Sequence, residues 1–318
     1  MISVNQEALK IVQTILSNTE RLGVSASKLN NGTTVIDMGQ RVPGSWLAGK
    51  YFAEITMGGM GEVTFGTFDL DGHLLPSVIV NSSNPLIAGW VCQKHAEPIP
   101  GPEHQPILTG PAKALLYPPD FSISYVNYQD NSSYAVAPLQ TSYPITEEIA
   151  WSFAKACQIH PENLFILVAP SNSLVCAIQV AARPLDNLMH RLQEEGFDIR
   201  KTRYAYASAP LPPLSSDELE AMGRINDSLL YGGHVVIYVE AKDEEIEQVL
   251  EKLPTIACPE YGKTFRQIFE EHDCDFHKID LRVHSTARIQ FNNITTGHSF
   301  ITGKINYDIL RKSFFGNP

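Results

Sequence analysis

The chain has 318 residues, of which 43% are hydrophobic and 19% charged, and this length allows either two domains or one large one. The formal net charge of -11 at pH 7 disfavours a nucleic-acid-binding protein, because neutralising phosphates requires a basic face. The N-terminus, MISVNQEALK, has no basic region followed by an apolar core, and no run approaches roughly 18 apolar residues. We therefore expect a cytoplasmic protein that neither binds nucleic acid nor crosses a membrane.

The cysteine pattern indicates free thiols. They are odd in number, widely spread and without a C-x-x-C pair, which favours free and mostly buried side chains. The five positions are Cys92, Cys157, Cys176, Cys258 and Cys274. The nearest approach to a metal-binding cluster is His272, Cys274 and His277, in the segment EEHDCDFHK. An acidic, solvated helix end is the better interpretation of that segment, so we assign no metal.

The first third of the chain begins with a helix and continues in strands. Ser3 and Gln6 resemble a capping box, and apolar residues at helical spacing extend from there towards Gly23. Strand-like runs punctuated by glycine follow in 33–39, 51–72 and 74–85. The alternation in EVTFGTF predicts a half-buried strand, and Asp71-Gly72 predicts a hairpin turn.

The middle of the chain combines helices, a long loop and strands. A helix is predicted over 86–95, with Lys94 in its last turn, followed by a proline-rich loop from Pro98 to Pro111. Pro111 suits the first position of the next helix, whose free N–H groups suit an anion, although a plain capped helix explains the sequence equally well. FSISYVNY at 121–128 and LFILVAP at 164–170 are predicted strands, and a helix over 146–158 lies between them.

The segment 174–192 is the centre of the predicted chemistry. Apolar residues recur at steps of three and four, which is typical of a helix with one buried face, and Pro184 should kink or restart this helix. Arg183 and Asp186 then lie on roughly the same face, near a freed backbone carbonyl. From the pattern alone, a solvated surface ion pair is the simpler interpretation of these two charges.

The remaining elements mix helices and strands without regular βαβ alternation. A strand is predicted at HVVIYVEA, helices at EEIEQVLEKLP and TFRQIFEEHD, and a strand, a turn at Thr296-Gly297, a strand and a short helix at the end. This order predicts an α+β (mixed α/β) fold. We expect a two-lobed subunit with a ligand cleft between the lobes, divided near residue 145 into an N-terminal lobe (1–145) and a C-terminal lobe (146–318) that can exchange segments.

Several stretches, in this order and spacing, resemble the methenyltetrahydromethanopterin cyclohydrolase family nearly end to end. Each stretch is weak alone, but together they are fairly specific. They are NGTTVIDMG at 31–39, ITMGGMGEV at 55–63, Gln93-Lys94, TGPAKAL at 109–115, APSNSLVCAIQVAARPLD at 169–186, INDSLLYGG at 225–233 and the closing N-x-x-TG…G-K…L-x-x-SF.

The resemblance implies an activity and an assembly. Family members are cytosolic homotrimers that need no metal or redox cofactor and hold the pterin in a cleft. They are hydrolases of cyclic amidines, which add water to the methenyl bridge of 5,10-methenyltetrahydromethanopterin and give the 5-formyl compound. The substrate carbon is already electrophilic, so a carboxylate that orients and deprotonates one water suffices. The resemblance therefore implies a cytosolic enzyme with a small-molecule substrate and no cofactor.

The resemblance also implies site residues. The family's catalytic pair is an arginine followed three residues later by a glutamate, and the matching positions are Arg183 and Asp186, so the chain is a divergent member with the shorter carboxylate. Three other residues also depart from the family. Pro184 stands where the family favours an apolar β-branched residue, and Lys113 stands where it favours arginine. Thr109 stands where the family favours a small glycine or serine. The expected substrate-binding residues are Lys94, Gly110, Pro111, Lys113, Asn226 and Asp227.

Two other functions remain open from the sequence. The altered carboxylate suits a paralogue on the same scaffold that hydrolyses, or closes by dehydration, a cyclic amidine in a non-pterin substrate. A protein that binds a one-carbon carrier without turning it over is the other possibility. Loss of turnover on replacing Asp186 distinguishes an enzyme from this binding protein.

Overall fold

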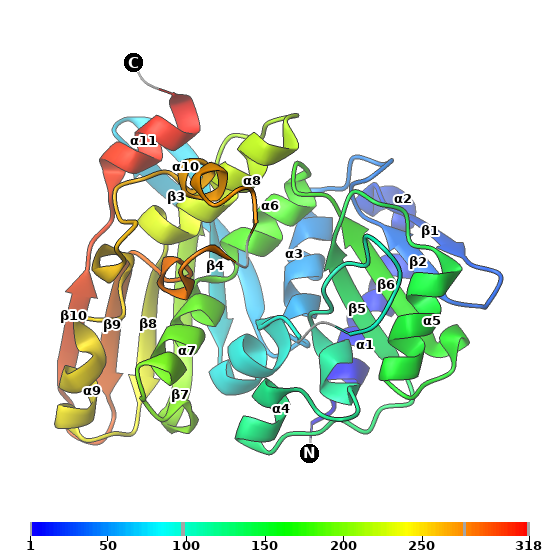
Figure 1. Ribbon diagram of the computed structural model, residues 1–318, viewed down its shortest axis with the longest axis horizontal. Helices are drawn as coiled ribbons and strands as arrows, with labels where there is room; N and C mark the ends of the chain where they lie inside the picture. The colour runs from blue at the N-terminus through cyan, green and yellow to red at the C-terminus, as the bar shows by residue number, and fades with distance from the viewer. Residues whose placement is uncertain (1, 97–98, 276–277, 317–318) are drawn as a thin grey trace. The chain divides into compact units, whose positions relative to one another are not determined.

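A computed structural model describes residues 2–96, 99–275 and 278–316 of the chain (Figure 1). The chain forms two compact units. Unit 1 contains residues 1–62 and 87–179, and unit 2 contains residues 63–86 and 180–318. Within the described ranges, no helix has the length and apolar character needed to cross a bilayer.

Unit 1 is built on a four-stranded sheet in the order β1-β2-β6-β5 (Figure 1). β1 pairs antiparallel with β2, and β6 lies parallel to both β2 and β5. The parallel strands are short and almost wholly buried, as expected for strands covered by helices on both faces. The strands are β1 (Ser25–Lys28), β2 (Thr34–Asp37), β5 (Ala135–Gln140) and β6 (Leu164–Ala169).

Helices cover this sheet. Ile149 and Phe153 of α5 pack in one core with Ala137 of β5 and Ile166 of β6, while α1 and α3 contact β5 and each other. The α-helices that begin in unit 1 are α1 (Val4–Leu16), α2 (Thr19–Leu22), α3 (Trp46–Thr56), α4 (Phe121–Val126), α5 (Glu147–Ala156) and α6 (Leu174–Ala181). Tighter or wider turns form η1 (Leu86–Gln93), η2 (Pro111–Leu115) and η3 (Pro161–Asn163).

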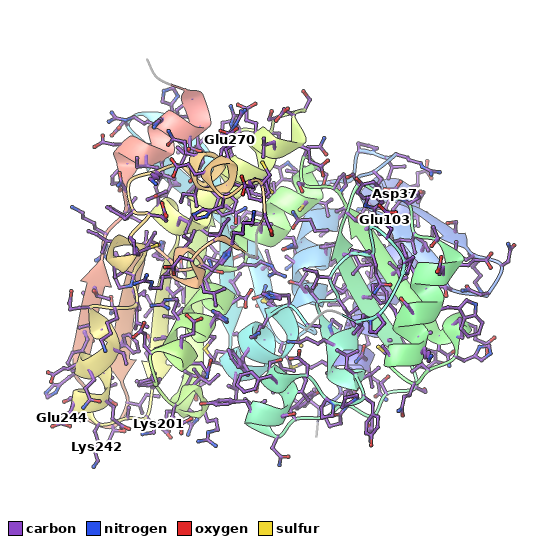
Figure 2. The ribbon with its side chains drawn as sticks, viewed as in Figure 1. Asp37, Glu103, Lys201, Lys242, Glu244 and Glu270 are labelled. Atoms are coloured by element: carbon purple, nitrogen blue, oxygen red, sulfur yellow. The ribbon has the colours of Figure 1, made fainter. Side chains whose placement is uncertain are left out.

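A polar turn ends β2. The carboxylate of Asp37, labelled in Figure 2, accepts hydrogen bonds from the N–H groups of Gly39 (2.9 Å), Gln40 (2.7 Å) and Arg41 (2.9 Å). This arrangement satisfies the backbone donors that no strand partner reaches. It fixes the direction in which the chain leaves the carboxyl end of the sheet.

Unit 2 is built on a six-stranded sheet in the order β10-β9-β8-β7-β4-β3. Pairing is antiparallel from β9 to β10, β7 to β8 and β4 to β7, and parallel between β8 and β9. Asp71 and Gly72, both with positive φ, form the two-residue turn of the β3–β4 hairpin. The strands are β3 (Glu62–Leu70), β4 (His73–Ser82), β7 (Thr202–Pro210), β8 (His234–Val239), β9 (Arg288–Asn293) and β10 (Ser299–Gly303).

Helix α7 packs on β7 and β8, where Ala205, Ala207 and Ala209 leave room for it, and α9 contacts β10 (Figure 1). A second core joins α10, α11 and η5 around Phe265, Phe314 and Tyr231. The α-helices of unit 2 are α7 (Pro184–Glu194), α8 (Glu218–Asp227), α9 (Asp243–Leu250), α10 (Phe265–Glu271) and α11 (Tyr307–Phe315). The short turns are η4 (Ile199–Lys201), η5 (Ser228–Gly232), η6 (Thr255–Ala257) and η8 (Leu281–Val283).

Most predicted elements are confirmed, including the α+β class, the Ser3 cap of the first helix, the hairpin at Asp71-Gly72 and the break at Pro184. None of the five cysteines, all of which the structure describes, forms a disulfide, and Cys274 is the exposed one. Pro98 of the predicted loop and His277 of the weighed metal cluster lie outside the described residues. No group of three or more His, Cys, Asp or Glu residues suited to a metal occurs in the ranges that the structure describes.

Two strand predictions are wrong. Residues 51–56 belong to helix α3, whose N-cap Ser45 accepts a hydrogen bond from the N–H of Ala48 at 3.1 Å. Residues 121–126 form helix α4, whose N-cap Asp120 accepts from the N–H of Ser122 at 2.9 Å. In both segments the cap and the tertiary packing outweigh the β-propensity of the aromatic and β-branched residues.

The division into units differs from the predicted division near residue 145. Strand β6 follows that point in sequence but pairs with β2 and β5, which keeps it in unit 1. The hairpin of β3 and β4 precedes that point but pairs through β4 with β7, which keeps it in unit 2. Each lobe therefore contains segments from both halves of the chain, because strand pairing rather than sequence order sets the units.

Candidate active site

The break between α6 and α7 places the central charged pair at a helix start. Arg183 is the N-cap residue of α7 and Pro184 is its first residue, a position where the missing N–H of proline has no cost. The carbonyl of Val180 instead accepts a hydrogen bond from the N–H of Arg183 at 2.9 Å. Helix α6 therefore ends at Ala181 and a new helix begins at Pro184, which sets the direction of the first turn of α7.

Asp186 lies in that first turn, where the positive end of the helix dipole favours a carboxylate. Nη1 of Arg183 donates to Oδ2 of Asp186 at 3.0 Å, and the two side chains are only 18% and 11% exposed. The pair is therefore more shielded than the surface ion pair that the sequence pattern alone favours. A shielded carboxylate whose orientation is fixed by an arginine is suited to hold and deprotonate one water molecule.

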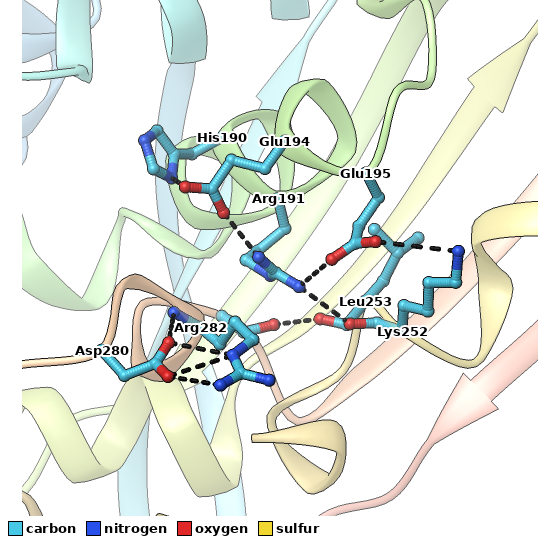
Figure 3. A network of polar contacts seen from close by, with 9 residues as sticks. His190, Arg191, Glu194, Glu195, Lys252, Leu253, Asp280 and Arg282 are labelled. Atoms are coloured by element: carbon cyan, nitrogen blue, oxygen red, sulfur yellow. Dashed lines mark hydrogen bonds and ion pairs between the residues drawn. The ribbon is translucent and has the colours of Figure 1, made fainter. Parts of the chain in front are cut away.

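A further polar network continues along α7 (Figure 3). Arg191 is almost completely buried and donates to the carboxylates of Glu194 and Glu195 and to the carbonyl of Lys252. Nδ1 of His190 lies 3.7 Å from Oε1 of Glu194. These residues were not singled out from the sequence, although their spacing of four and eight residues from Asp186 places His190 and Glu194 on its face of the helix.

Lys113 is completely enclosed in unit 1. Its Nζ donates to Oγ of Ser122 at 2.7 Å and to the carbonyl of Trp90 at 3.5 Å, and it lies 3.9 Å from Oδ1 of Asp120. Oγ of Ser122 in turn donates to Asp120 at 2.5 Å. This lysine joins η1, η2 and the start of α4 through a buried polar network.

Lys94 follows η1, and its N–H donates to the carbonyl of Gly89 at 3.1 Å. Its Nζ lies 5.6 Å from the centre of the Trp90 ring, within the range of a cation–π contact. Since the indole N–H of Trp90 donates to the carbonyl of Ser122 at 2.9 Å, the ring under Lys94 is fixed by the same network that contains Lys113.

The Gly110-Pro111 turn is also fixed from several sides. Gly110 has φ 76° and ψ −163°, a conformation open almost only to glycine, and its N–H donates to the carbonyl of Cys92 at 2.9 Å. The carbonyl of Pro111 accepts from Nδ2 of the buried Asn5 at 2.7 Å. This turn is a rigid, backbone-defined feature of unit 1.

Replacing Gly110 with alanine is expected to lower the free energy of unfolding by about 1–3 kcal/mol. The conformation is unfavourable for any residue with a Cβ, and the added atom would lie 2.6 Å from Cδ of Pro138. Urea unfolding measures the change. Gly72→Ala is the matched control, because Gly72 also has positive φ but its Cβ would meet open space. Equal losses in the two variants would contradict a role for the close contact with Pro138.

Asn226 and Asp227 end helix α8 and are bound within unit 2. Asp227 is 1% exposed and accepts hydrogen bonds from the N–H of Phe265 at 2.7 Å and from Oγ of Ser313 at 2.6 Å. Burial raises the pKa of this carboxyl to about 7, against the lowering effect of the two hydrogen bonds. Nδ2 of Asn226 donates to the carbonyl of Met222 at 2.9 Å, which is a contact within α8, whereas the contacts of Asp227 join α8 to α10 and α11.

Besides the Lys113 network, unit 1 contains a buried polar network around Asp130, which the sequence does not indicate. Oδ2 of Asp130 accepts from the N–H and Nδ2 of Asn5 and from Oγ of Ser3, which ties the start of α1 to the segment before β5. The residues are more than 120 positions apart in sequence, and no local spacing signals the contact.

The fold and the charged pair define an α+β protein whose site is suited to activating water. A family model described as cyclohydrolase (MCH) matches residues 3–314. The methenyltetrahydromethanopterin cyclohydrolase of Methanocaldococcus jannaschii is 37% identical over 317 residues, which cover 98% of each chain. Those of Methanothermobacter marburgensis and Methanospirillum hungatei are 36% and 37% identical, each over 99% of both chains. The chain belongs to this cyclohydrolase family.

Proposed function

We propose that this chain adds water to the methenyl bridge of 5,10-methenyltetrahydromethanopterin and gives 5-formyltetrahydromethanopterin. The observation that carries the proposal is the ion pair of Arg183 with Asp186 in the first turn of α7, in a chain that belongs to the cyclohydrolase family. The enzyme is then a hydrolase that opens a carbon–nitrogen bond of a cyclic amidine. Its partner is a small-molecule substrate.

The chemistry requires one positioned base. The methenyl carbon of the substrate is part of an amidinium-like cation, so a weak nucleophile such as water attacks it once it is held in line. Asp186 orients the water and takes its proton, while Arg183 keeps the carboxylate in place and balances the change of charge as the cation is consumed. No cofactor is required for this reaction.

The other site residues enter the proposal by correspondence with the family. Lys94, Gly110 and Pro111 would contribute to the substrate site, as would Asn226. Lys113 and Asp227 are enclosed, so their proposed part is to hold neighbouring elements in place. Lys113 binds the backbone of Trp90 and the side chain of Ser122. Asp227 stabilises the packing of α8 against α10 and α11.

The assay that tests the proposal mixes the purified chain with methenyltetrahydromethanopterin and follows the loss of the methenyl chromophore. Enzyme-dependent loss with formation of the formyl compound is the expected result. Tight binding without turnover would instead indicate a protein that binds a one-carbon carrier. Absence of both would point to a different cyclic amidine, in keeping with the aspartate and proline of this helix start.

We further propose that the protein is cytoplasmic and assembles as a homotrimer, as the resemblance implies. Tyr204 and Tyr238 support self-association, because they are 53% and 39% exposed and their rings meet edge to face on neighbouring strands β7 and β8. Exposed tyrosines are typical of protein interfaces. Light scattering should give about three times the chain mass of 35.2 kDa. A mass equal to one chain would refute the trimer.

A further inference from the structure

Helix α7 depends on contacts of its own to fix its direction. Pro184 has no N–H to donate, so the hydrogen-bond ladder of α6 is interrupted where α7 begins. The chain has by then entered unit 2, which it does at residue 180. The direction in which Asp186 points depends on the rotation of α7 about its axis. That rotation is therefore set by what α7 contacts in unit 2.

Apolar packing holds α7 on the sheet but is weak at fixing its rotation. Four apolar side chains of α7 are fully buried, namely Leu185, Leu188, Met189 and Leu192. Contacts between apolar side chains have no preferred direction. Hydrogen bonds do have one, because they weaken steeply when donor, hydrogen and acceptor are out of line. A hydrogen bond near the first turn is thus the kind of contact that holds a carboxylate in one orientation.

Asn187, the residue after Asp186, makes such a contact. Its Nδ2 donates to the carbonyl of Ser285 at 3.0 Å, across 98 residues of sequence. Because a carbonyl only accepts, the NH2 group of the amide must face Ser285. The backbone N–H of Asn187 donates to the carbonyl of Arg183 at 3.1 Å and closes the first helical turn. Asn187 therefore ties the turn that bears the charged pair to the segment after η8.

Arg191 provides a second anchor one turn further along α7 (Figure 3). Positions 187 and 191 are four residues apart, so their side chains lie on the same face of the helix. Nη2 of Arg191 donates to the carbonyl of Lys252 at 3.1 Å. Arg191 is only 3% exposed, which strengthens this bond by excluding water. Helix α7 is thus attached to a second segment, which lies between α9 and η6.

The two anchoring segments are bound to each other. Oγ of Ser285 donates to the carbonyl of Leu253, the residue after Lys252. The N–H of Thr255 donates to the carbonyl of Thr286 at 3.1 Å. Ser285 and Thr286 are both buried. The support to which α7 is attached is therefore enclosed as well as cross-linked.

We propose that Asn187 is a positioning residue for hydration of the methenyl bridge, because its hydrogen bond to Ser285 holds the first turn of α7 in the rotation that directs Asp186 at the attacking water. The inference rests on the proposed function and adds to it the residue that orients the general base. The effect passes through the backbone, since Asn187 and Asp186 are consecutive residues of one turn. Displacing a reacting group by about 1 Å lowers rates on the order of a hundredfold, so a small rotation of this turn has a measurable effect.

The test is the Asn187→Leu variant, which removes the donor, changes the size of the side chain little and keeps a good helix former in α7. We expect kcat to fall about tenfold with KM unchanged, because the base is misplaced while substrate binding is not altered. In the Asp186→Asn background the same substitution should change kcat by less than about twofold, because the position of an absent base no longer matters. Asn187→Ala, which lets water reach the carbonyl of Ser285, should give the same pattern.

Asn293→Ala is the control for a loss of stability alone. Nδ2 of Asn293 also donates to a backbone carbonyl of unit 2, that of Ala241, at 2.9 Å, but from strand β9. The midpoint of urea unfolding should fall in this variant while kcat stays that of wild type. Amide hydrogen exchange adds a readout that requires no activity. Asn187→Leu should speed exchange in residues 184–192 and not in α9, whereas Asn293→Ala should do the reverse.

Each outcome decides between positioning and a merely structural role. Wild-type kcat in both Asn187 variants refutes the proposal. An equal fall in kcat with and without the carboxylate of Asp186 also refutes it, because general loosening of unit 2 gives that result. Unchanged exchange in residues 184–192 refutes it whether or not the chain turns over substrate. A wild-type protein without turnover overturns the proposed function instead, and the exchange measurement still decides whether Asn187 fixes the turn.

Discussion

Replacing Asp186 with asparagine is expected to lower kcat for hydration of methenyltetrahydromethanopterin by about 100- to 10,000-fold, the usual contribution of a general base. The amide keeps the size of the side chain and can still accept the hydrogen bond that Arg183 donates to the carboxylate at 3.0 Å. It cannot take a proton from water. The initial rate of chromophore loss measures the effect, and binding of the substrate should change far less than kcat.

A matched control separates this effect from the loss of any ion pair. Asp308 and Arg311 on α11 form a pair at the same spacing of three residues, but on exposed surface. Asp308→Asn should leave kcat unchanged. Equal activity in Asp186→Asn and the wild-type protein would contradict the assignment of the base.

The length of the side chain at this position is a second variable. In Asp186→Glu the carboxylate moves by roughly 1 Å relative to the helix start that Pro184 fixes, and such a displacement lowers rates by about a hundredfold. We therefore expect Asp186→Glu to be slower than wild type but faster than Asp186→Asn. A silent wild-type protein that gains activity as Asp186→Glu would show that its present substrate is a different one.

Local signals allowed the helix start at the site to be predicted. Proline within a helical pattern has a direct steric consequence, so the restart at Pro184 and the common face of Arg183 and Asp186 followed from spacing alone. The degree to which the pair is shielded did not follow, because burial depends on what packs around α7. That information is in the tertiary structure and not in the spacing.

The burial of Lys113 and Asp227 could not be predicted from the sequence either, because it also depends on tertiary packing. The partners of Asp227 lie 38 and 86 residues further along the chain, and no periodic pattern relates such distant positions. Lys113 is close in sequence to Ser122, but the sequence predicts a strand from residue 121, where the structure has helix α4. A lysine or aspartate is usually exposed, so its complete burial becomes evident only when the partners are known.

The buried carboxyl of Asp227 should make stability depend on pH. Its pKa is about 7 in the folded chain against an ordinary value of 3.8, so the folded state binds the proton more tightly than the unfolded state. The resulting stabilisation is complete below pH 3.8 and is lost as pH rises to about 7. A shift of this size corresponds to a change on the order of 4 kcal/mol in the free energy of unfolding.

The Asp227→Asn variant isolates this contribution, since its amide can still accept from the N–H of Phe265 and can donate to Oγ of Ser313. Urea unfolding at several pH values should show the variant gaining stability relative to wild type from pH 4 to pH 7. Asp280→Asn is the opposite control: Arg282 lowers the pKa of Asp280 from 3.8 to about 2, so wild type should gain on that variant as pH rises from about 2 to 3.8, and the difference should stay constant from pH 4 to pH 7. A constant difference between Asp227→Asn and wild type across this range would show that Asp227 ionises normally in the folded chain, and that its two hydrogen bonds outweigh its burial.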